Sequence, residues 1–273
     1  MSNSPPVISA RQKAISCYFQ SRRSFWKQAY EGQNLQSTIY QARMDLALQF
    51  FESLALRSDA KVLDAGCGAG ILAVELARRG YQVHAIDPAH AMLDLTRQRA
   101  DKAGVRDRVT TRSGDICALD FPDNSLDVVC ALGVLPWVAT AYEALMEVHR
   151  VLKPGAHFIA TIDNKNRLSH RLDLLLPTRR LIGRFLRSLH LRDSTVSWSH
   201  TIKEIDASLS GAGFEKINCK TLGFGPFTLA GFRLVPDRIG RQLDRVLRNR
   251  SDSFAPLRTG GAQYVFLAKR VTH

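Results

Sequence analysis

A glycine-rich stretch near residue 65 is the part of this sequence whose residue types and spacing point most directly to chemistry. Lys61–Ala65 has the composition of a buried strand, and Gly66, Gly68 and Gly70 follow at alternate positions before an apolar helical segment. Glycines at this spacing let the backbone bend sharply and approach a ligand, and the following helix directs its free amide groups at the same place. The stretch predicts a site for a nucleotide-like ligand, with Cys67 in its wall.

Acidic residues follow the predicted strands at the same edge of the sheet. Asp64 ends the first strand, Asp87 ends the second strand 23 residues later, and Asp115 comes after the third strand. A carboxylate at the end of the second strand can bind both hydroxyls of a ribose. An aspartate with an apolar neighbour, here Ile116, suits the edge and face of a purine.

Two cofactors fit the glycine turn when it is taken alone. Residues 68–73, Gly-Ala-Gly-Ile-Leu-Ala, satisfy the looser form of the dinucleotide fingerprint. The carboxylate of Asp64 instead favours a ligand that carries an ammonium and a sulfonium, because it would repel a pyrophosphate. The turn by itself leaves both possibilities open.

The order of the predicted elements indicates an α/β fold with a doubly wound, mostly parallel sheet, because each right-handed crossover returns the chain in the same direction. Strands are expected at 61–65, 81–87, 108–113, 125–132, 157–162, 214–221 and 263–269, and helices at 40–54, 71–80, 89–103, 139–152 and 201–211. We expect an N-terminal helical cap over 1–58, a ligand-binding core over 59–163, and an acceptor and lid region over 164–273. This last region includes the closing strands and an insertion at 222–260.

Several motifs resemble those of the class I S-adenosylmethionine-dependent methyltransferases. The pattern acidic-x-Gly-x-Gly-x-Gly begins at Asp64, Gly114 precedes Asp115 and Ile116, and Arg150-Val151-Leu152-Lys153-Pro154-Gly155 resembles the turn before strand five of that family. The resemblance covers about residues 60–163. It implies a Rossmann-like sheet of seven strands with the last strand antiparallel, and S-adenosylmethionine as the cofactor, with S-adenosylhomocysteine as the product.

The resemblance also implies a set of cofactor-binding residues. Tyr40 and Arg43, on the helix before the core, resemble N-terminal residues that close over the methionine end of the cofactor, and an arginine there can bind a carboxylate. Pro88 follows Asp87 and can pack beside the adenine. The full predicted set is Asp64, Gly66, Cys67, Gly68, Gly70, Asp87, Pro88, Gly114, Asp115, Ile116, Leu132, Tyr40 and Arg43.

The acceptor is predicted to be an organic metabolite. Strand four ends in Leu132-Gly133-Val134-Leu135 and lacks the Asn/Asp-Pro-Pro-aromatic motif of many amine-modifying methyltransferases. The resemblance to the ubiquinone and menaquinone biosynthesis branch implies methylation of an oxygen, in preference to a carbon, of a small or lipid-linked acceptor. His200 is the candidate general base, and His170 and Asp163, at the end of strand five, are weaker candidates. The alternative for His200 is an ordinary surface histidine preceding Thr201 as the helix N-cap. No residues have metal-ligand spacing, so no metal is expected.

The net charge of +13 is concentrated outside the predicted core, since residues 164–258 carry 18 Lys and Arg against 8 Asp and Glu. Basic amphipathic helices expected at 179–189 and 239–248 would suit an anionic membrane surface, or would pack as lid helices with their arginines exposed. RNA or protein methylation is the alternative activity, with nucleic acid favoured less because no appended RNA-binding module is visible. A non-catalytic module that binds the cofactor or a membrane is the alternative of another class. The expected location is cytoplasmic, with possible peripheral contact with the membrane.

Overall fold

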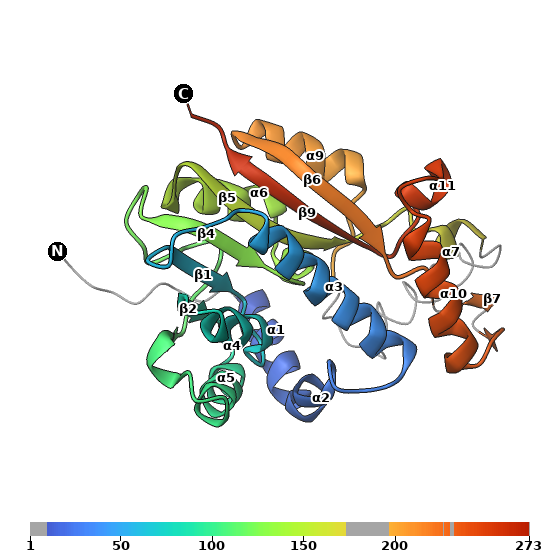
Figure 1. The fold of residues 1–273 in the computed structure, drawn as a ribbon, viewed down its shortest axis with the longest axis horizontal. Helices are drawn as coiled ribbons and strands as arrows, with labels where there is room; N and C mark the ends of the chain where they lie inside the picture. The colour runs from blue at the N-terminus through green and yellow to red at the C-terminus, as the bar shows by residue number, and fades with distance from the viewer. Residues whose placement is uncertain (1–9, 173–196, 226, 230–231, 273) are drawn as a thin grey trace.

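A seven-stranded sheet forms the centre of the molecule in a computed structural model that describes residues 10–172, 197–225, 227–229 and 232–272 (Figure 1). The strand order is β3-β2-β1-β4-β5-β9-β6, and β9 runs antiparallel to both of its neighbours. The strands are β1 (Lys61–Ala65), β2 (Gln82–Ile86), β3 (Val109–Arg112), β4 (Leu126–Ala131), β5 (Leu152–Asp163), β6 (Phe214–Leu222) and β9 (Gln263–Arg270). This is the predicted sheet, including its antiparallel last strand.

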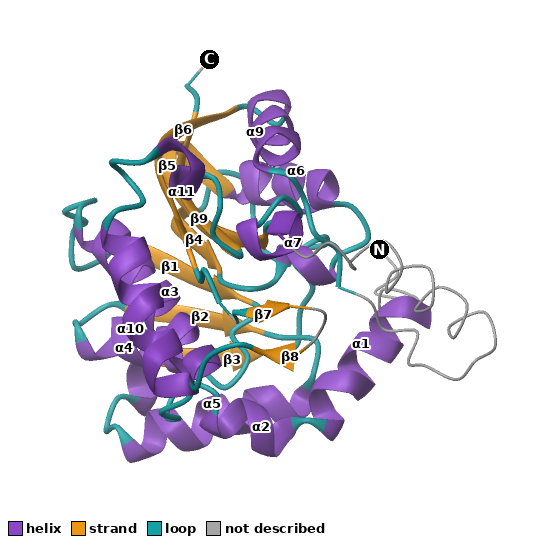
Figure 2. Ribbon diagram, turned by 90° about the vertical axis from the view of Figure 1, so that its right-hand side faces the viewer, coloured by secondary structure: helices purple, strands orange, loops and turns teal. Residues whose placement is uncertain are grey.

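Helices cover both faces of the sheet (Figure 2). One face packs against α3 (Leu35–Glu52), α4 (Ile71–Arg78) and α5 (His90–Lys102), and the other against α6 (Ala141–Val151) and α9 (Ile202–Gly211). The remaining helices are α1 (Ala10–Ser21), α2 (Arg23–Gln28), α7 (Leu168–Leu172), α10 (Asp237–Asn249) and α11 (Ala255–Arg258), with 3-10 turns η1 (Arg106–Arg108) and η2 (Leu135–Trp137).

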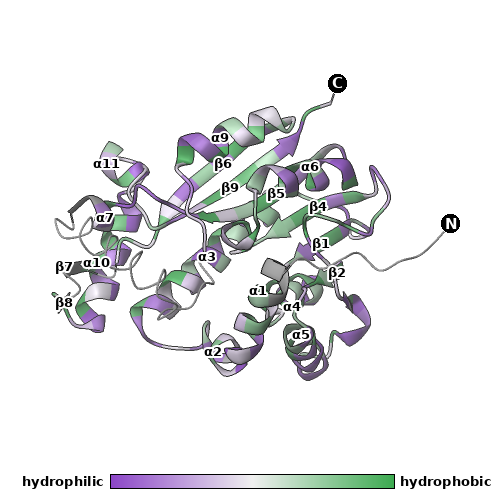
Figure 3. Cartoon of the chain, turned by 180° about the vertical axis from the view of Figure 1, so that it is seen from behind, coloured by the Kyte–Doolittle hydropathy of each residue, from purple (hydrophilic) through white to green (hydrophobic). Residues whose placement is uncertain are grey.

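The core consists of two apolar layers separated by the sheet. The strands at the centre are hydrophobic on both faces (Figure 3), as expected for parallel strands that helices cover on both sides. Phe51 of α3 and Leu76 of α4 lie in one layer, while Leu145 of α6 and Phe158 of β5 lie in the other. The alternation of strands and helices predicted from the sequence therefore places the carboxyl ends of the parallel strands along one edge of the sheet.

The strand and helix boundaries agree with the predicted ones to within a few residues, with two larger differences. Helix α3 starts at Leu35, five residues before the predicted start at residue 40. Strand β5 starts at Leu152 rather than His157, because Leu152 pairs with Leu126 of β4 before the register shifts at a bulge. The basic helix expected at 239–248 is α10. The one expected at 179–189 lies outside the described residues.

The segments outside the 59–163 region pack onto the same sheet. Helix α3 contacts β5, β9 and β6, so it covers one face of the sheet on the side that ends at β6. Between β6 and β9 the chain forms a small hairpin, β7 (Thr228–Leu229) with β8 (Phe232–Arg233), and then α10 and α11, as an insertion between two sheet strands. In the part of the chain that the structure describes, every helix is too short or too polar to cross a membrane.

Candidate cofactor and acceptor site

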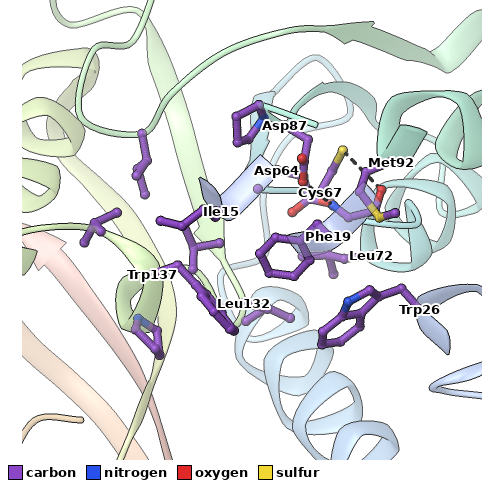
Figure 4. A pocket seen from close by; sticks show the side chains of 18 of the residues that line it. Ile15, Phe19, Trp26, Asp64, Cys67, Leu72, Asp87, Met92, Leu132 and Trp137 are labelled. Atoms are coloured by element: carbon purple, nitrogen blue, oxygen red, sulfur yellow. Dashed lines mark hydrogen bonds between the residues drawn. The ribbon is translucent and has the colours of Figure 1, made fainter. Parts of the chain in front are cut away.

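A cavity of about 460 Å³ opens at the carboxyl ends of β1, β2 and β4. This is the edge at which open α/β sheets bind ligands. The side chains that line it include the acidic residues Asp64 and Asp87 and the aromatic rings of Phe19, Trp26 and Trp137 (Figure 4). The volume is within the range of sites for cofactors and drug-sized molecules.

The glycine turn forms part of the cavity wall through its backbone. The amides of Gly66 and Cys67 both donate to the carbonyl of Ile86, at 2.7 and 2.9 Å, which ties the turn to the end of β2. Gly68 has a φ of +53°, and a Cβ added there would meet no atom within 4 Å, so its backbone faces open space at the cavity.

Gly70 has a different role from the one the sequence suggested. It does not line the cavity, and a Cβ at this residue would lie 2.6 Å from the side chain of Thr96 on α5. Gly70 therefore allows α4 and α5 to pack closely, which is a structural requirement.

Asp64 lies buried in the wall of the cavity with only 2% of its surface exposed. Burial raises the pKa of its carboxyl to about 7, although the backbone hydrogen bond from Ala73 acts in the opposite direction and Asp87 adds to the rise. Its Oδ2 atom has no hydrogen-bond partner among the described residues. A buried carboxylate oxygen without a partner fits a cationic ligand group that would supply one.

Asp87 also lines the cavity, directly after the end of β2. Its Oδ2 accepts from the amide of Gly68 at 3.0 Å and its Oδ1 accepts from the amide of Ala89 at 2.8 Å, so both oxygens are held in place at the end of β2. Burial raises the pKa of Asp87 to about 6. The arrangement suits a carboxylate that accepts from the two hydroxyls of a ribose.

The predicted adenine-binding residues also meet at the cavity. Pro88, Gly114, Asp115, Ile116 and Leu132 all line it. The Oδ1 atom of Asp115 accepts from the amide of Cys117 at 3.0 Å, which fixes the carboxyl, and Ile116 beside it is buried. A fixed polar group next to an apolar surface is what a purine requires.

Arg43 is buried at the far end of the acidic wall. Its Nη2 donates to the hydroxyl of Tyr30, and its guanidinium lies 4.9 Å from the ring centroid of Tyr40. Burial lowers the pKa of Arg43, but Tyr30, Tyr40 and Asp163 raise it by more, so the group stays charged. Its Nε has no partner within the described residues. A buried cation with a free donor fits an incoming carboxylate.

Gly133 is a residue whose role the sequence did not reveal. It has a φ of +76°, and a Cβ there would lie 2.7 Å from Nη1 of Arg43. The glycine thus makes room for the guanidinium beside the end of β4. Gly133 belongs to the Leu-Gly-Val-Leu sequence at the end of strand four, which lacks the motif of amine-modifying enzymes and instead provides this contact.

Aromatic side chains from the N-terminal helices form the second half of the cavity. Phe19 of α1 lies 5.0 Å from the ring of Trp137 and 5.5 Å from the ring of Trp26, measured between centroids. Trp26 and Tyr30 in turn approach Tyr40. The sequence predicted a helical cap here without these contacts; the density of aromatic residues over 18–40 was the available signal.

His200 lies outside the lining of the cavity. Its amide donates to the carbonyl of Asp163 at 3.0 Å, and its carbonyl accepts from the amide of Lys165. Burial lowers the pKa of its imidazole. Thr201 forms the N-cap of α9, with a capping box to Glu204. The Gly and Phe content of residues 222–232 predicts an apolar wall over the acceptor, but the described residues of this stretch do not line the cavity either, and Phe224 is buried.

Comparison with known proteins identifies the fold. Residues 63–160 match the family model described as a methyltransferase domain. The ubiquinone biosynthesis O-methyltransferase of Azorhizobium caulinodans is 31% identical over 167 residues, which are 61% of this chain and 63% of that protein. The chain therefore contains a domain of the class I, S-adenosylmethionine-dependent methyltransferase kind. It spans between a quarter and two thirds of the length of the curated relatives it matches.

Solved structures of other class I proteins have the same fold. The magnesium protoporphyrin IX methyltransferase of Synechocystis with bound S-adenosylhomocysteine has a TM-score of 0.65 and 19% identity, over 95% of this chain and 99% of that chain. The cyclase SpnF has a TM-score of 0.65 and 18% identity, over 98% of both chains. At these identities the likeness shows the fold and not the reaction.

The residues present fit S-adenosylmethionine, which supplies a methyl group on a positively charged sulfur. Asp64, with its unpartnered oxygen, would hold the ammonium, and Arg43, with its free donor, would hold the carboxylate. Asp87 would hold the ribose, and Asp115 with Ile116 the adenine. Of the thirteen predicted cofactor residues, only Gly70 lies outside the lining of the cavity.

Proposed function

We propose that this class I methyltransferase transfers a methyl group from S-adenosylmethionine to an oxygen, in preference to a carbon, of a small or lipid-linked organic acceptor. The observation that carries the proposal is the aromatic lining of the cavity, where the ring of Phe19 packs against both Trp26 and Trp137. Planar apolar molecules bind well between such rings. The relative from Azorhizobium, named for O-methylation in ubiquinone biosynthesis, supports an acceptor of this class.

We assign Asp163, at the end of β5, as the group that takes the proton from the acceptor oxygen. It lines the same cavity as Tyr40 and Arg43, whereas His200 does not. Burial raises the pKa of Asp163, while Arg43 and Arg167 act in the opposite direction. A carboxylate whose pKa is raised by burial is a stronger base than one in water.

Replacing Asp163 with Asn is expected to lower kcat by roughly 100-fold or more, the usual contribution of a general base. In the native enzyme kcat/KM should rise with pH through the raised pKa of Asp163, and this acidic limb should disappear in the variant. Asp163→Glu should restore part of the rate, and the Kd for S-adenosylhomocysteine serves as the control for cofactor binding. An unchanged pH profile in Asp163→Asn would contradict this assignment. His200 would then be the candidate general base, and His200→Gln would test it.

The proposed activity is tested by two measurements on the full chain. Calorimetric titration with S-adenosylhomocysteine measures cofactor binding, and transfer of a radioactive methyl group is then screened with phenolic quinone precursors, a lipid extract and RNA. Label in a phenolic or lipid fraction supports the proposal. Label in RNA alone would support the alternative, and cofactor binding with label in none of them would support a protein that binds the cofactor without methyl transfer.

Peripheral contact with an anionic membrane belongs to the same proposal, because a lipid-linked acceptor is presented at a bilayer surface. The C-terminal half carries the excess of Lys and Arg that such a surface attracts. Nucleic acid is the competing anionic partner.

A further inference from the structure

Helix α10 exposes its apolar side chains instead of burying them. Ile239, Leu243 and Val246 follow one another along the helix, and their exposed fractions are 46%, 40% and 52%. At a spacing of four and then three residues they form one stripe on the helix surface. The sequence allowed for a lid helix with its apolar face packed on the domain, and α10 has the opposite orientation.

The inward face of α10 explains why the stripe points outward. Asp244 is fully buried, and its Oδ1 accepts from the amide of Phe224 at 2.7 Å. One turn earlier Gly240 is also buried, and a Cβ there would lie 3.4 Å from Cδ2 of Leu35 on α3. Turning the helix to bury the stripe would break the hydrogen bond and bring bulky residues against α3. The exposed stripe is therefore fixed by the fold.

Arginines that project about 100–160° around α10 from the stripe line a separate hollow between α10 and the turn that leads into α3. Arg238, Arg241 and Arg245 line it together with polar residues and one carboxylate, Glu31. Glu31 lies 3.5 Å from Arg99, so its charge is already partly balanced, and Arg241 donates to the carbonyl of Gln33. The hollow as a whole is electropositive and suits phosphate oxygens.

We propose that the exposed face of α10 docks on an anionic phospholipid surface. The stripe enters the boundary between headgroups and acyl chains, and Arg238, Arg241 and Arg245 contact the phosphates, as expected for a basic amphipathic helix lying in the plane of a bilayer. The exposed apolar residues are aliphatic, whereas single-stranded nucleic acid is bound through aromatic stacking. This favours lipid over RNA.

The docking surface is connected to the cavity through α3. Leu35 at the start of α3 packs against α10, and the same helix carries Tyr40 and Arg43 into the cavity. A bilayer that holds α10 would thereby hold the cavity at a fixed orientation to its surface. The inference rests on the proposed function for its purpose, since a lipid-linked acceptor would approach from the bilayer.

Flotation with lipid vesicles tests the inference on the full chain. The protein is expected to float with vesicles of phosphatidylcholine mixed with phosphatidylglycerol, and to bind pure phosphatidylcholine vesicles much more weakly. The triple variant I239S/L243S/V246S should lose about tenfold or more in partitioning, because three partly exposed aliphatic groups no longer enter the bilayer. The double variant R238Q/R245Q should lose the preference for phosphatidylglycerol and its sensitivity to salt.

Matched controls separate this surface from a general effect. Met146→Ser on α6 and Ile217→Ser on β6 remove exposed apolar side chains elsewhere, and Arg57→Gln removes an exposed arginine; all three should float like the native protein. Inorganic phosphate that competes with vesicles at millimolar concentration, or triple-variant binding equal to native, would overturn the inference in favour of a free-phosphate site or another surface. RNA binding without vesicle binding would overturn it as well.

The same variants distinguish this inference from the proposed function. The triple Ser variant should keep native affinity for S-adenosylhomocysteine and native methyl transfer to a water-soluble phenol, because α10 does not line the cavity. Vesicle binding without any methyl transfer would support the docking surface and contradict the proposed function. Methyl transfer without vesicle binding would support the proposed function and contradict the docking surface.

Discussion

Replacing Asp64 with Asn is expected to stabilise the cofactor-free protein and to weaken its binding of S-adenosylmethionine. An aspartate has a pKa near 3.9 in the unfolded chain, and burial raises the pKa of Asp64 to about 7 in the folded protein. The stability of the native protein therefore falls as pH rises from about 4 to 7, because over this range the unfolded chain releases a proton that the folded state still holds. A shift of about three units corresponds to an upper bound of roughly 4 kcal/mol.

Asn has no charge to bury and can still accept the hydrogen bond from Ala73. The gain in Tm of Asp64→Asn over the native protein should consequently be larger at pH 8 than at pH 5, by several degrees, since 1 kcal/mol corresponds to about 2–4 °C in a protein of this size class. Thermal unfolding at the two pH values measures it. Asp94→Asn, an exposed aspartate on α5, is the matched control and should show no such difference.

Cofactor binding should change in the opposite direction. An ammonium prefers the ionised carboxylate, so the Kd of the native protein should decrease as pH rises through about 7 and then level off. In Asp64→Asn this dependence should be reduced, and the affinity at pH 8 should fall by roughly 10- to 100-fold, the value of one hydrogen bond between charged groups. Equal Kd values for both proteins at pH 8 would contradict the assignment of Asp64 to the ammonium.

Replacing Asp87 with Ala is expected to abolish measurable cofactor binding. The variant loses a carboxylate placed to accept from two ribose hydroxyls. Each hydrogen bond to a charged group contributes roughly 1.5–3 kcal/mol, so the loss of binding free energy is roughly 3–6 kcal/mol, or about 100- to 10,000-fold in Kd. It also leaves the amides of Gly68 and Ala89 without their acceptor, which loosens the glycine turn.

Calorimetric titration with S-adenosylhomocysteine measures this loss. Asp87→Asn separates the two effects, because its side-chain oxygen can still accept from one of the amides while the charge is removed. Asp94→Ala on α5 serves as the control, because its side chain is exposed and paired to Arg97. Native affinity in Asp87→Ala together with native thermal stability would show that the ribose lies elsewhere.

The cavity suggests why the proposed acceptor is apolar while the surface is so basic. Among the described residues, arginines of α10 line a hollow on the outside of the protein, whereas the cavity wall is aromatic and acidic apart from Arg43. A positive exterior can attract an anionic surface without touching the reacting groups. The basic exterior is thus relevant to the surface on which the protein is proposed to act, and the lining of the cavity is relevant to the proposed acceptor.

The sequence determined the fold and most of the cofactor end. Strand and helix periodicity is a local property, and so is the glycine turn, so the sheet, its strand ends, Asp64, Asp87 and Asp115 could all be located from short stretches. The antiparallel last strand followed from the resemblance to the family and is present as β9. The role of Gly70 could not be read in this way, because its neighbour Thr96 belongs to another helix.

The tertiary structure alone decided the acceptor end and the orientation of α10. The aromatic half of the cavity brings together α1, α2, α3 and η2, which are separated by up to about a hundred residues, and no local pattern encodes that meeting. The same holds for Asp163 beside Arg43, and for Gly133 beneath it. The amphipathic pattern of α10 was plain in the sequence, but which face points inward depended on one buried contact, between Asp244 and the amide of Phe224. Local patterns fix elements, whereas a site that several distant elements share exists only once they have packed.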